Sequence, residues 1–343
     1  MELRDFRPKS MMVTKRTAVD RPRFPVIDAH NHLAEPFGGG WDKKPLPALL
    51  DALDMAGVVA YVDLDGGWGE EILQRHLDYF KAPAPDRFQI FGGVDWSRWP
   101  DHGDRFGEWA AARLREQARW GAQGLKIWKP FGLHVRDQND ALVAVDDPRL
   151  DPLWATAGEL GLPVMVHVAD PVAFFEPVDA TNERWEELHN HPDWQFTSPP
   201  FPTFLSLVEG FAAVVARHPA TTFIGAHVGC YAENLGWVSD VLRRCPNFHV
   251  DISARVGELC RQPYSARRFF IEFADRILFG SDFGPRLDGY RSYYRFLETD
   301  DEYFSYLPSD PPSQGRWYAY GLYLPDDVLR RVYHDNAVKV LKL

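Results

Sequence analysis

Two histidines stand two residues apart near the start of the chain, in the stretch VIDAHNH at positions 26–32. Because residues i and i+2 of a strand point to the same side, the imidazoles of His30 and His32 would face one point in space. That arrangement suits two ligands of a single metal ion. A histidine pair alone is weak evidence, since many core or surface histidines fall at this spacing by chance. The pair predicts a metal site only if other strands supply further ligands.

Three more side chains that can bind a metal each follow an apolar, strand-like run: His167, His227 and Asp282. The carboxyl ends of parallel strands meet at one face of a barrel, and active sites form there. Side chains far apart in the sequence would then converge. This convergence favours a metal site over the alternative that each histidine is a satisfied core residue.

Neutral imidazoles and one carboxylate suit Zn²⁺, although Mn²⁺, Fe²⁺ or Co²⁺ would also fit. We predict that one ion per chain is held by four side chains at strand ends: His30, His32, His167 and Asp282. A bound metal can lower the pKa of its water to about 7 and polarise a substrate oxygen. Asp282 could also take a proton from the attacking water. His227 could be either a further ligand or an acid that stabilises developing charge.

The segments that must position these side chains alternate between strand and helix patterns. Strands are expected at residues 26–32, 58–64, 88–94, 124–128, 163–167, 222–227, 248–252 and 277–281. Helices are expected at residues 46–56, 70–80, 104–120, 150–160, 204–217, 234–244, 265–274 and 325–341. This rhythm implies parallel strands joined by right-handed crossovers. It predicts an α/β fold, a (β/α)₈ TIM-type barrel with inserted loops and a C-terminal helix. A doubly wound open sheet is the alternative, but only a ring of strand ends brings all the ligands together.

The barrel is expected over residues 25–343, preceded by an extension at residues 1–24 that covers the barrel bottom or a neighbouring subunit. Residues 170–203 are too long for an ordinary connection, and such loops are usually lids or binding loops. Two aromatic segments, 185–201 and 290–323, could stack on a flat substrate or bury a subunit interface.

Composition and charge narrow the class of partner. The chain has 343 residues and a formal net charge of −11, which argues against a nucleic-acid partner and leaves a small-molecule substrate. Its three cysteines form no CxxC motif and predict no disulfide framework, which fits a cytoplasmic location. No signal-peptide pattern and no membrane span is expected.

Several motifs carry a family resemblance. The HxH pair, Gly-Leu-Lys-Ile at 124–127, Gly-Ala-His-Val-Gly at 225–229 and Phe-Gly-Ser-Asp-Phe-Gly at 279–284 resemble those of the amidohydrolase superfamily. The resemblance is closer to its amidohydrolase-2 group and covers roughly residues 25–343. That group contains metal-dependent lactonases and other hydrolases, and non-oxidative decarboxylases related to aminocarboxymuconate semialdehyde decarboxylase.

The resemblance implies that the four predicted ligands hold one metal and that His227 acts in catalysis. Lys126 matches a strand-four position where some superfamily members carry a carboxylated lysine that bridges two metals. The alternative is a lysine that hydrogen-bonds substrate or packs inside the barrel. A homodimer is expected only by analogy with related proteins.

Other residues near the expected strand ends have two interpretations each. Arg255 could clamp a substrate carboxylate or form a salt bridge to a loop acid. Trp128 and Lys129 could line the pocket, although a tryptophan here is more often core. The remaining histidines are interpreted as surface or structural residues: His76, His102, His134, His189, His191, His218, His249 and His334.

The resulting hypothesis is a metal-dependent hydrolase that uses metal-activated water on an ester, lactone or amide carbonyl of a small molecule. The alternative is a metal-dependent, non-oxidative decarboxylase of an aromatic or muconate-like acid, in which His227 or Asp282 handles the proton. A catalytically silent binding barrel is the third hypothesis, but it would have no need for this set of metal-binding side chains.

Overall fold

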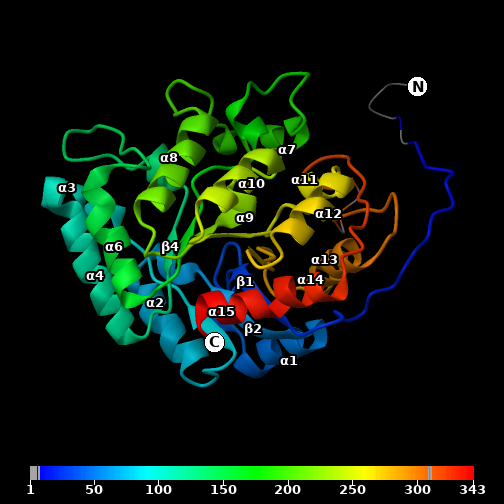
Figure 1. The fold of residues 1–343 in the computed structure, drawn as a ribbon, viewed down its shortest axis with the longest axis horizontal. Coiled ribbons are helices and arrows are strands. Elements are labelled where there is room, and N and C mark those ends of the chain that lie inside the picture. The colour runs from blue at the N-terminus through cyan, green and yellow to red at the C-terminus, as the bar shows by residue number, and fades with distance from the viewer. Residues whose placement is uncertain (1–5, 7, 308, 310) are drawn as a thin grey trace.

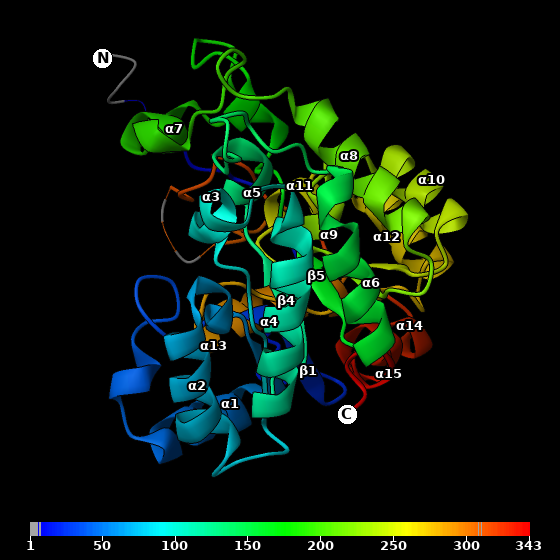
Figure 2. The ribbon, with the colours of Figure 1, turned by 90° about the vertical axis from the view of Figure 1, so that its left-hand side faces the viewer.

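The fold was analysed in a computed structural model that describes residue 6, residues 8–307, residue 309 and residues 311–343. Eight parallel strands form its centre, and helices surround them (Figures 1 and 2). The strands are β1 (Val26–Asn31), β2 (Val58–Asp63), β3 (Phe88–Ile90), β4 (Leu125–Ile127), β5 (Val164–Val166), β6 (Phe223–Gly225), β7 (Phe248–Asp251) and β8 (Ile277–Leu278).

Backbone hydrogen bonds join the strands into a closed ring. The ladders run in the order β1-β2-β3 and β4-β5-β6-β7-β8. Between β3 and β4, Lys126 N donates to Gly92 O over 2.8 Å. Between β8 and β1, Ala29 N donates to Phe279 O over 2.9 Å. The (β/α)₈ barrel is therefore confirmed, and the open-sheet alternative is wrong.

Residues at the ends of the predicted helices explain where these helices begin and end. The predictions for residues 46–56 and 204–217 match α1 and α8 residue for residue. Gly57, at φ 78°, ends α1 in the left-handed conformation that glycine adopts at little cost. The Thr203 side chain accepts from Ser206 N and caps α8. The helices are α1 (Leu46–Ala56), α2 (Glu70–His76), α3 (Trp99–His102), α4 (Phe106–Trp120), α5 (Pro130–Leu133), α6 (Asp151–Leu160), α7 (Trp185–Asn190), α8 (Phe204–Arg217), α9 (Ala226–Gly229), α10 (Leu235–Arg244), α11 (Val256–Leu259), α12 (Pro263–Glu272), α13 (Leu287–Glu298), α14 (Asp326–Arg330) and α15 (Asn336–Leu341).

The structure differs from the predicted helices at several bounds, among them the start of α12, and it adds a helix after β8. The start expected at residue 265 lies at Pro263, because proline fits the first turn of a helix. The aromatic segment 290–323 begins inside α13, whose buried face carries Tyr290, Tyr293, Tyr294 and Leu297. This i, i+3, i+4, i+7 spacing is helical, so the signal for α13 was present in the sequence.

The C-terminal helix closes the bottom of the barrel. It continues from α14 through a π-helical turn at Arg331–Asp335 into α15. Side chains of α15 pack against barrel-lining residues in one buried apolar cluster that includes Ile27, Met165, Ile224, Val340 and Leu341. The end of the barrel opposite the predicted ligands is thus filled with apolar side chains.

The described residues before β1 form no helix or strand and run along the outside of the body (Figure 1). Thr17 N donates to Asp301 Oδ2 over 2.7 Å, and Arg23 N donates to Glu298 Oε1 over 3.0 Å. The boundary of the extension at residue 24 stays a prediction, and residues 1–5 and 7 lie outside the described part. All three cysteines are free and buried. Among the described residues, no helix has the length and apolar character needed to cross a membrane.

A buried carboxylate ties the first and last strands to α13. Asp28 Oδ2 accepts hydrogen bonds from Asn31 Nδ2 (2.8 Å), Ser281 Oγ (2.6 Å) and Tyr290 OH (2.7 Å). Burial raises the pKa of Asp28 to about 6, although these hydrogen bonds oppose the shift. The network holds the backbone on both sides of the predicted ligands.

Replacing Tyr290 with Phe removes one of these donors and keeps the ring. We expect Tyr290→Phe to lower the free energy of unfolding by about 1–3 kcal/mol, because a buried acceptor loses a partner. Urea denaturation followed by circular dichroism measures the change. Tyr264→Phe, at a side chain that is 80% exposed, is the control and should leave stability unchanged. Equal stability of both variants would contradict a role for the network.

Candidate metal centre

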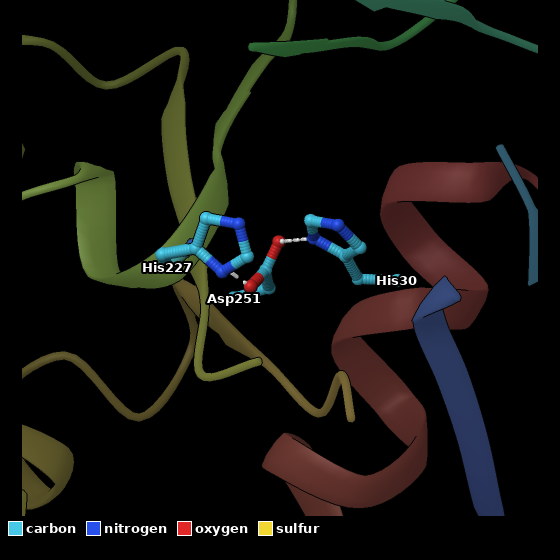
Figure 3. Close-up of side chains that lie close together, drawn as sticks. All are labelled: His30, His227 and Asp251. Carbon is cyan, nitrogen blue, oxygen red and sulfur yellow. Dashed lines mark hydrogen bonds and ion pairs between the residues drawn. The ribbon is translucent and has the colours of Figure 1, made fainter. Parts of the chain in front are cut away.

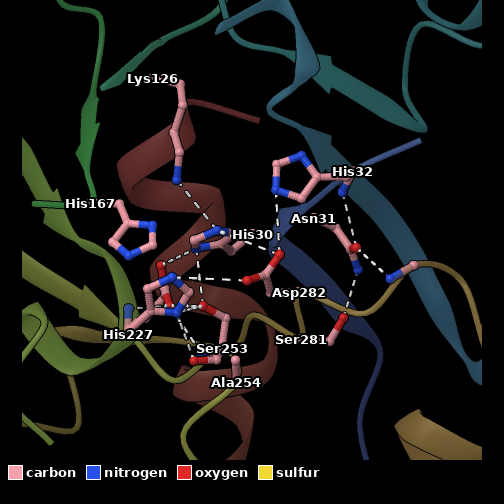
Figure 4. Close-up of polar contacts among 12 residues, drawn as sticks. His30, Asn31, His32, Lys126, His167, His227, Ser253, Ala254, Ser281 and Asp282 are labelled. Atoms are coloured by element: carbon pink, nitrogen blue, oxygen red, sulfur yellow. Dashed lines mark hydrogen bonds and ion pairs between the residues drawn. The ribbon is translucent and has the colours of Figure 1, made fainter. Parts of the chain in front are cut away.

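Four of the predicted side chains meet at the carboxyl ends of the strands (Figure 4). Asp282 Oδ1 lies 3.3 Å from His32 Nε2 and 4.0 Å from His30 Nε2. Its other oxygen lies 3.9 Å from His227 Nε2. The three imidazoles are buried, whereas the Asp282 side chain is 22% exposed. One carboxylate thus lies among three imidazoles at the edge of a cavity.

Each of these imidazoles donates its Nδ1 proton to a fixed oxygen behind it. Carboxylate and carbonyl oxygens only accept hydrogen bonds, so the bonded Nδ1 carries a proton and Nε2 is the nitrogen left for the centre. The three bonds are His30 to Asp251 Oδ2 (2.8 Å), His32 to Asp65 Oδ1 (2.7 Å) and His227 to Ser253 O (2.9 Å). The Nε2 atoms therefore face Asp282.

This donor set fits a divalent cation. Ligand atoms of His30, His32 and Asp282 all lie within 4.8 Å of one another. The Nε2 atoms of His30 and His227 and the carboxylate of Asp282 are electron-rich, and a positive charge between them stabilises the group. Neutral imidazoles whose other nitrogen is held by an acceptor are the usual metal ligands in proteins. We conclude that the centre can hold one divalent ion.

His167 lies beside this group. Its ring centroid is 4.4 Å from that of His227, and its Nε2 is 3.4 Å from Asp170 Oδ1. Among the described residues, the set of ligand atoms within 4.8 Å of one another does not include His167. The structure thus brings His167 to the centre, and its role as a ligand stays a prediction.

Burial and neighbouring charge set the protonation of the centre. Burial lowers the pKa of His167 to about 4 and holds the pKa of His30 and His227 well below its usual value. His32 differs: burial also acts to lower its pKa, but hydrogen bonds to Asp282 and Asp65 outweigh burial and raise the pKa to about 9. Without a metal both nitrogens of His32 therefore carry protons, and a bound cation would displace the proton on Nε2. In spite of burial, the pKa of Asp282 lies well below its usual range because of the imidazoles around it.

Lys126 reaches the same centre from β4. Its side chain is buried, and Nζ lies 3.4 Å from His30 Nε2. Burial lowers the pKa of this amine to about 8. The ring of Trp128 stacks on His32 with centroids 5.0 Å apart and on Trp68 with centroids 4.0 Å apart. Both predicted positions therefore border the centre, and Trp128 is part of the site wall as well as of the packing.

A second buried carboxylate, that of Asp251, lies between His30 and His227 and holds the backbone around the centre (Figure 3). Besides binding the ring of His30, Asp251 accepts from His227 N and Ser253 N through Oδ1, both over 3.0 Å. His227 and Val228 have φ angles of 58° and 60°, which non-glycine residues adopt at a cost. His30, His227 and Asp251 could by distance form a metal group of their own. Because both Asp251 oxygens already accept hydrogen bonds, we interpret Asp251 as orienting the two histidines.

The third possible metal group, Asp63, Asp65 and His76, lies behind His32. His76 Nδ1 bonds Asp63 Oδ2 over 2.6 Å, which leaves no room for an ion between those two atoms. Asp65 Oδ2 also accepts from Leu33 N (2.8 Å) and Ala34 N (2.7 Å). This group therefore supports the turn after β1, and His76 is structural, as predicted.

A cavity of about 410 Å³ opens in front of the centre. Arg255 lines this cavity and is buried. Its guanidinium donates a hydrogen bond to Ala254 O over 2.9 Å. Within the described chain, no carboxylate lies within 4.0 Å of this guanidinium. Arg255 therefore makes no direct salt bridge to a loop acid, although its charge acts to lower the pKa of Glu187, Glu233 and Glu258. His134, expected away from the site, also lines the cavity, and that prediction is corrected.

The long loop at 170–203 forms one wall of the cavity with Phe174, Trp194 and Phe196. It also contributes Arg184, which sequence reasoning missed. This buried guanidinium bonds Glu187 over 2.7 Å and pairs with Glu258. Two exposed ion pairs tie the same loop to other loops: Arg261 with Glu183 and Arg316 with Glu186, both at 2.7 Å.

The orienting acids were also missed, although a signal was available. Asp65 and Asp251 stand at the ends of β2 and β7, at the same face as the predicted ligands. Lys129, expected to line the pocket, does so and pairs with Asp170 over 2.5 Å.

Removing one donor at a time tests the metal centre. After loading with metal and dialysis, we expect the wild-type protein to retain roughly one divalent ion per chain. We expect the variants His30→Ala and Asp282→Ala to lose most of this ion. Mass spectrometric metal analysis gives the content per chain. His189→Ala, on α7 and stacked on Trp185, is the control. Full retention in both site variants would contradict the centre, whereas two ions per wild-type chain would indicate that Lys126 is a bridging ligand.

The two orienting acids make different predictions. Asp251→Asn should weaken metal binding roughly 10–100-fold and also lower turnover at saturating metal, because Asp251 holds both His30 and the backbone of His227. Asp65→Asn should weaken metal binding by a similar factor and leave turnover at saturating metal closer to wild type. Chelator competition gives the affinity, and steady-state assays at saturating metal give the turnover. Identical behaviour of both variants would contradict a separate role for Asp251 at His227.

The chain was compared with known proteins. A family model described as amidohydrolase matches residues 27–343. No curated protein matches the sequence. Among solved structures, 2,6-dihydroxybenzoate decarboxylase from Rhizobium is 17% identical, with a TM-score of 0.57 over 93% of this chain and 99% of that one.

Two further solved structures are similar. Dihydroxybenzoic acid decarboxylase from Polaromonas, solved with bound manganese and an inhibitor, 2-nitroresorcinol, is 16% identical, with a TM-score of 0.55 over 93% of this chain and 97% of that one. 5-Carboxyvanillate decarboxylase from Sphingomonas paucimobilis is 15% identical, with a TM-score of 0.52 over 86% and 82%. At these identities the likeness shows the barrel fold. Because the family model spans nearly the whole chain, this protein belongs to the amidohydrolase family.

Proposed function

We propose that this protein is a metal-dependent lyase that releases CO₂ from a hydroxylated aromatic acid. The observation that carries the proposal is Arg255, a buried guanidinium without a protein carboxylate partner, in the same cavity as the metal centre. A buried cation of this kind is costly unless a ligand supplies the opposite charge. A substrate carboxylate supplies that charge and can bind guanidinium through two hydrogen bonds.

The other walls of the cavity suit a flat ring. Trp128 and Trp68 lie on the His32 side, and Trp194 and Phe196 come from the long loop. Aromatic faces bind planar ligands by stacking and by burying their apolar surface. The cavity volume of about 410 Å³ lies in the range of small-molecule sites.

The similar structures support the reaction class and the cofactor. Two of them are named as decarboxylases of hydroxylated benzoates, and the Polaromonas enzyme was solved with manganese. We therefore extend our expectation of Zn²⁺ to Mn²⁺ as an equal candidate for the ion held by His30, His32 and Asp282. When bound, such an ion supplies positive charge that orients the substrate oxygens and stabilises negative charge on them.

The side chains of this protein have distinct parts in the reaction. Arg255 binds the acid and orients it in the cavity. The bond between the ring and its carboxyl carbon breaks, CO₂ leaves, and the electron pair stays on the ring carbon, which then takes a proton. Asp282 Oδ2 and His227 Nε2 lie 3.9 Å apart, which is too far for a direct hydrogen bond but allows one water to relay a proton between them and on to that carbon.

Hydrolysis of an ester, lactone or amide, our first expectation, is the second candidate. The same centre could assist it, since His227 Nε2 has a lone pair that can accept a proton. The comparisons favour the lyase, and a neutral ester or amide would leave the guanidinium of Arg255 without a directly bonded carboxylate.

The test is turnover of hydroxybenzoates, 2,6-dihydroxybenzoate and 5-carboxyvanillate among them, by metal-loaded protein in D₂O. We expect release of CO₂ and deuterium at the vacated carbon, and loss of activity on chelation. Arg255→Gln should raise KM at least about tenfold through loss of a charge-assisted pair, and Arg217→Gln, outside the cavity, is its control. Hydrolysis of esters or lactones with solvent oxygen in the product, and no CO₂ from any acid, would overturn the lyase in favour of the hydrolase.

A further inference from the structure

A second cavity of about 300 Å³ lies next to the metal cavity. The two share Ala254, Asp282 and Gln314 as lining residues. Asp282 therefore borders both spaces. Figure 4 shows Ala254 and Ser281, which line the second cavity, on the side of Asp282 away from Lys126. Asp282 has a φ angle of 58°, in the left-handed region, and is a lining residue of both cavities.

The walls of the second cavity are mainly apolar. They include Phe283, Tyr293, Tyr306 and Leu307, from the segment after β8. The phenol groups already have partners: Tyr293 OH accepts from Ala254 N over 2.8 Å, and Tyr306 OH donates to Gly315 O over 3.0 Å. The two tyrosines thus present ring surface to the cavity, which suits an uncharged, apolar group.

Charge at the second cavity differs from charge at the first. Arg286 lines it but is largely exposed and already pairs with Asp288 over 3.1 Å. Apart from Arg286 and Asp282, no charged side chain of the described chain lines this cavity. The carboxylate of an acid therefore belongs on the Arg255 side, and the second cavity offers mainly apolar surface, with serine side chains and Gln314 among its lining residues.

We propose that the second cavity is a subsite for an apolar, ring-sized substituent of the substrate, whose acid-bearing ring lies in the metal cavity. This inference rests on the proposed function and adds a substrate class to it: aromatic acids larger than one ring. Because Asp282 borders both cavities, such a substrate passes beside the centre that acts on it. Burying a phenyl group there should strengthen binding at least about tenfold, at the usual free energy for apolar area.

Calorimetric titration of the full, metal-loaded chain tests this directly. The probes are salicylate and salicylates that carry one phenyl group at ring position 3, 4 or 5. Ser292→Phe fills the second cavity from α13, since Ser292 lines it and does not line the metal cavity. Ser206→Phe adds the same ring to an exposed position of α8 and is the matched control.

We expect at least one phenylsalicylate to bind more tightly than salicylate, by about tenfold or more, both to wild type and to Ser206→Phe. We expect Ser292→Phe to bind salicylate still but to lose this preference. Equal binding of salicylate and all phenylsalicylates by wild type would overturn the subsite and leave the proposed function standing. A preference that persists in a folded Ser292→Phe variant would also overturn it. Failure of every probe to bind would overturn the proposed function and the subsite together.

Discussion

A hydrogen bond behind each imidazole decides which nitrogen faces the cavity. His30, His32 and His227 all donate Nδ1 protons to oxygens that cannot donate in return, so all three turn Nε2 toward Asp282. If any of these acceptors were absent, the ring could rotate or change tautomer. The donor set, the affinity for a cation and the path for a proton all depend on this arrangement.

The barrel supplies those acceptors in the same way as it supplies the ligands. Asp65 follows β2, Asp251 ends β7 and Ser253 comes two residues later. Burying the two carboxylates is costly, and backbone amides reduce that cost: Leu33 and Ala34 donate to Asp65, and Ser253 donates to Asp251. The same bonds hold the turns that carry His32 and His227. Ligand orientation and backbone stability are therefore one network.

The sequence allowed the barrel and the centre to be predicted because both depend on short-range patterns. Apolar runs that end in His or Asp mark strand ends, and the closed ring confirms that these ends meet. Asp65 and Asp251 could have been found by the same rule. Even α13 was detectable, from the helical spacing of Tyr290, Tyr293, Tyr294 and Leu297.

Other features depend on contacts that no local pattern encodes. Arg184 and Glu258 are 74 residues apart and meet only because the loop 170–203 folds back over the barrel mouth. The packing of the long loops leaves Arg255 without a carboxylate within 4.0 Å. The same packing forms the second cavity beside Asp282. Many residues that line the two cavities belong to these loops, so the lining was the part of the site that the sequence predicted least.

The closure of the barrel between β8 and β1 also bears on the order of events during synthesis. His30 and Asp282 are separated by most of the chain, and α15 must fill the barrel bottom below them. Contacts of such high sequence separation form late, because the closure entropy of a long loop must be offset first. A growing chain therefore carries the histidine pair long before it carries the aspartate. The complete set of side chains at the candidate metal centre therefore exists only once residues up to Asp282 have been synthesised.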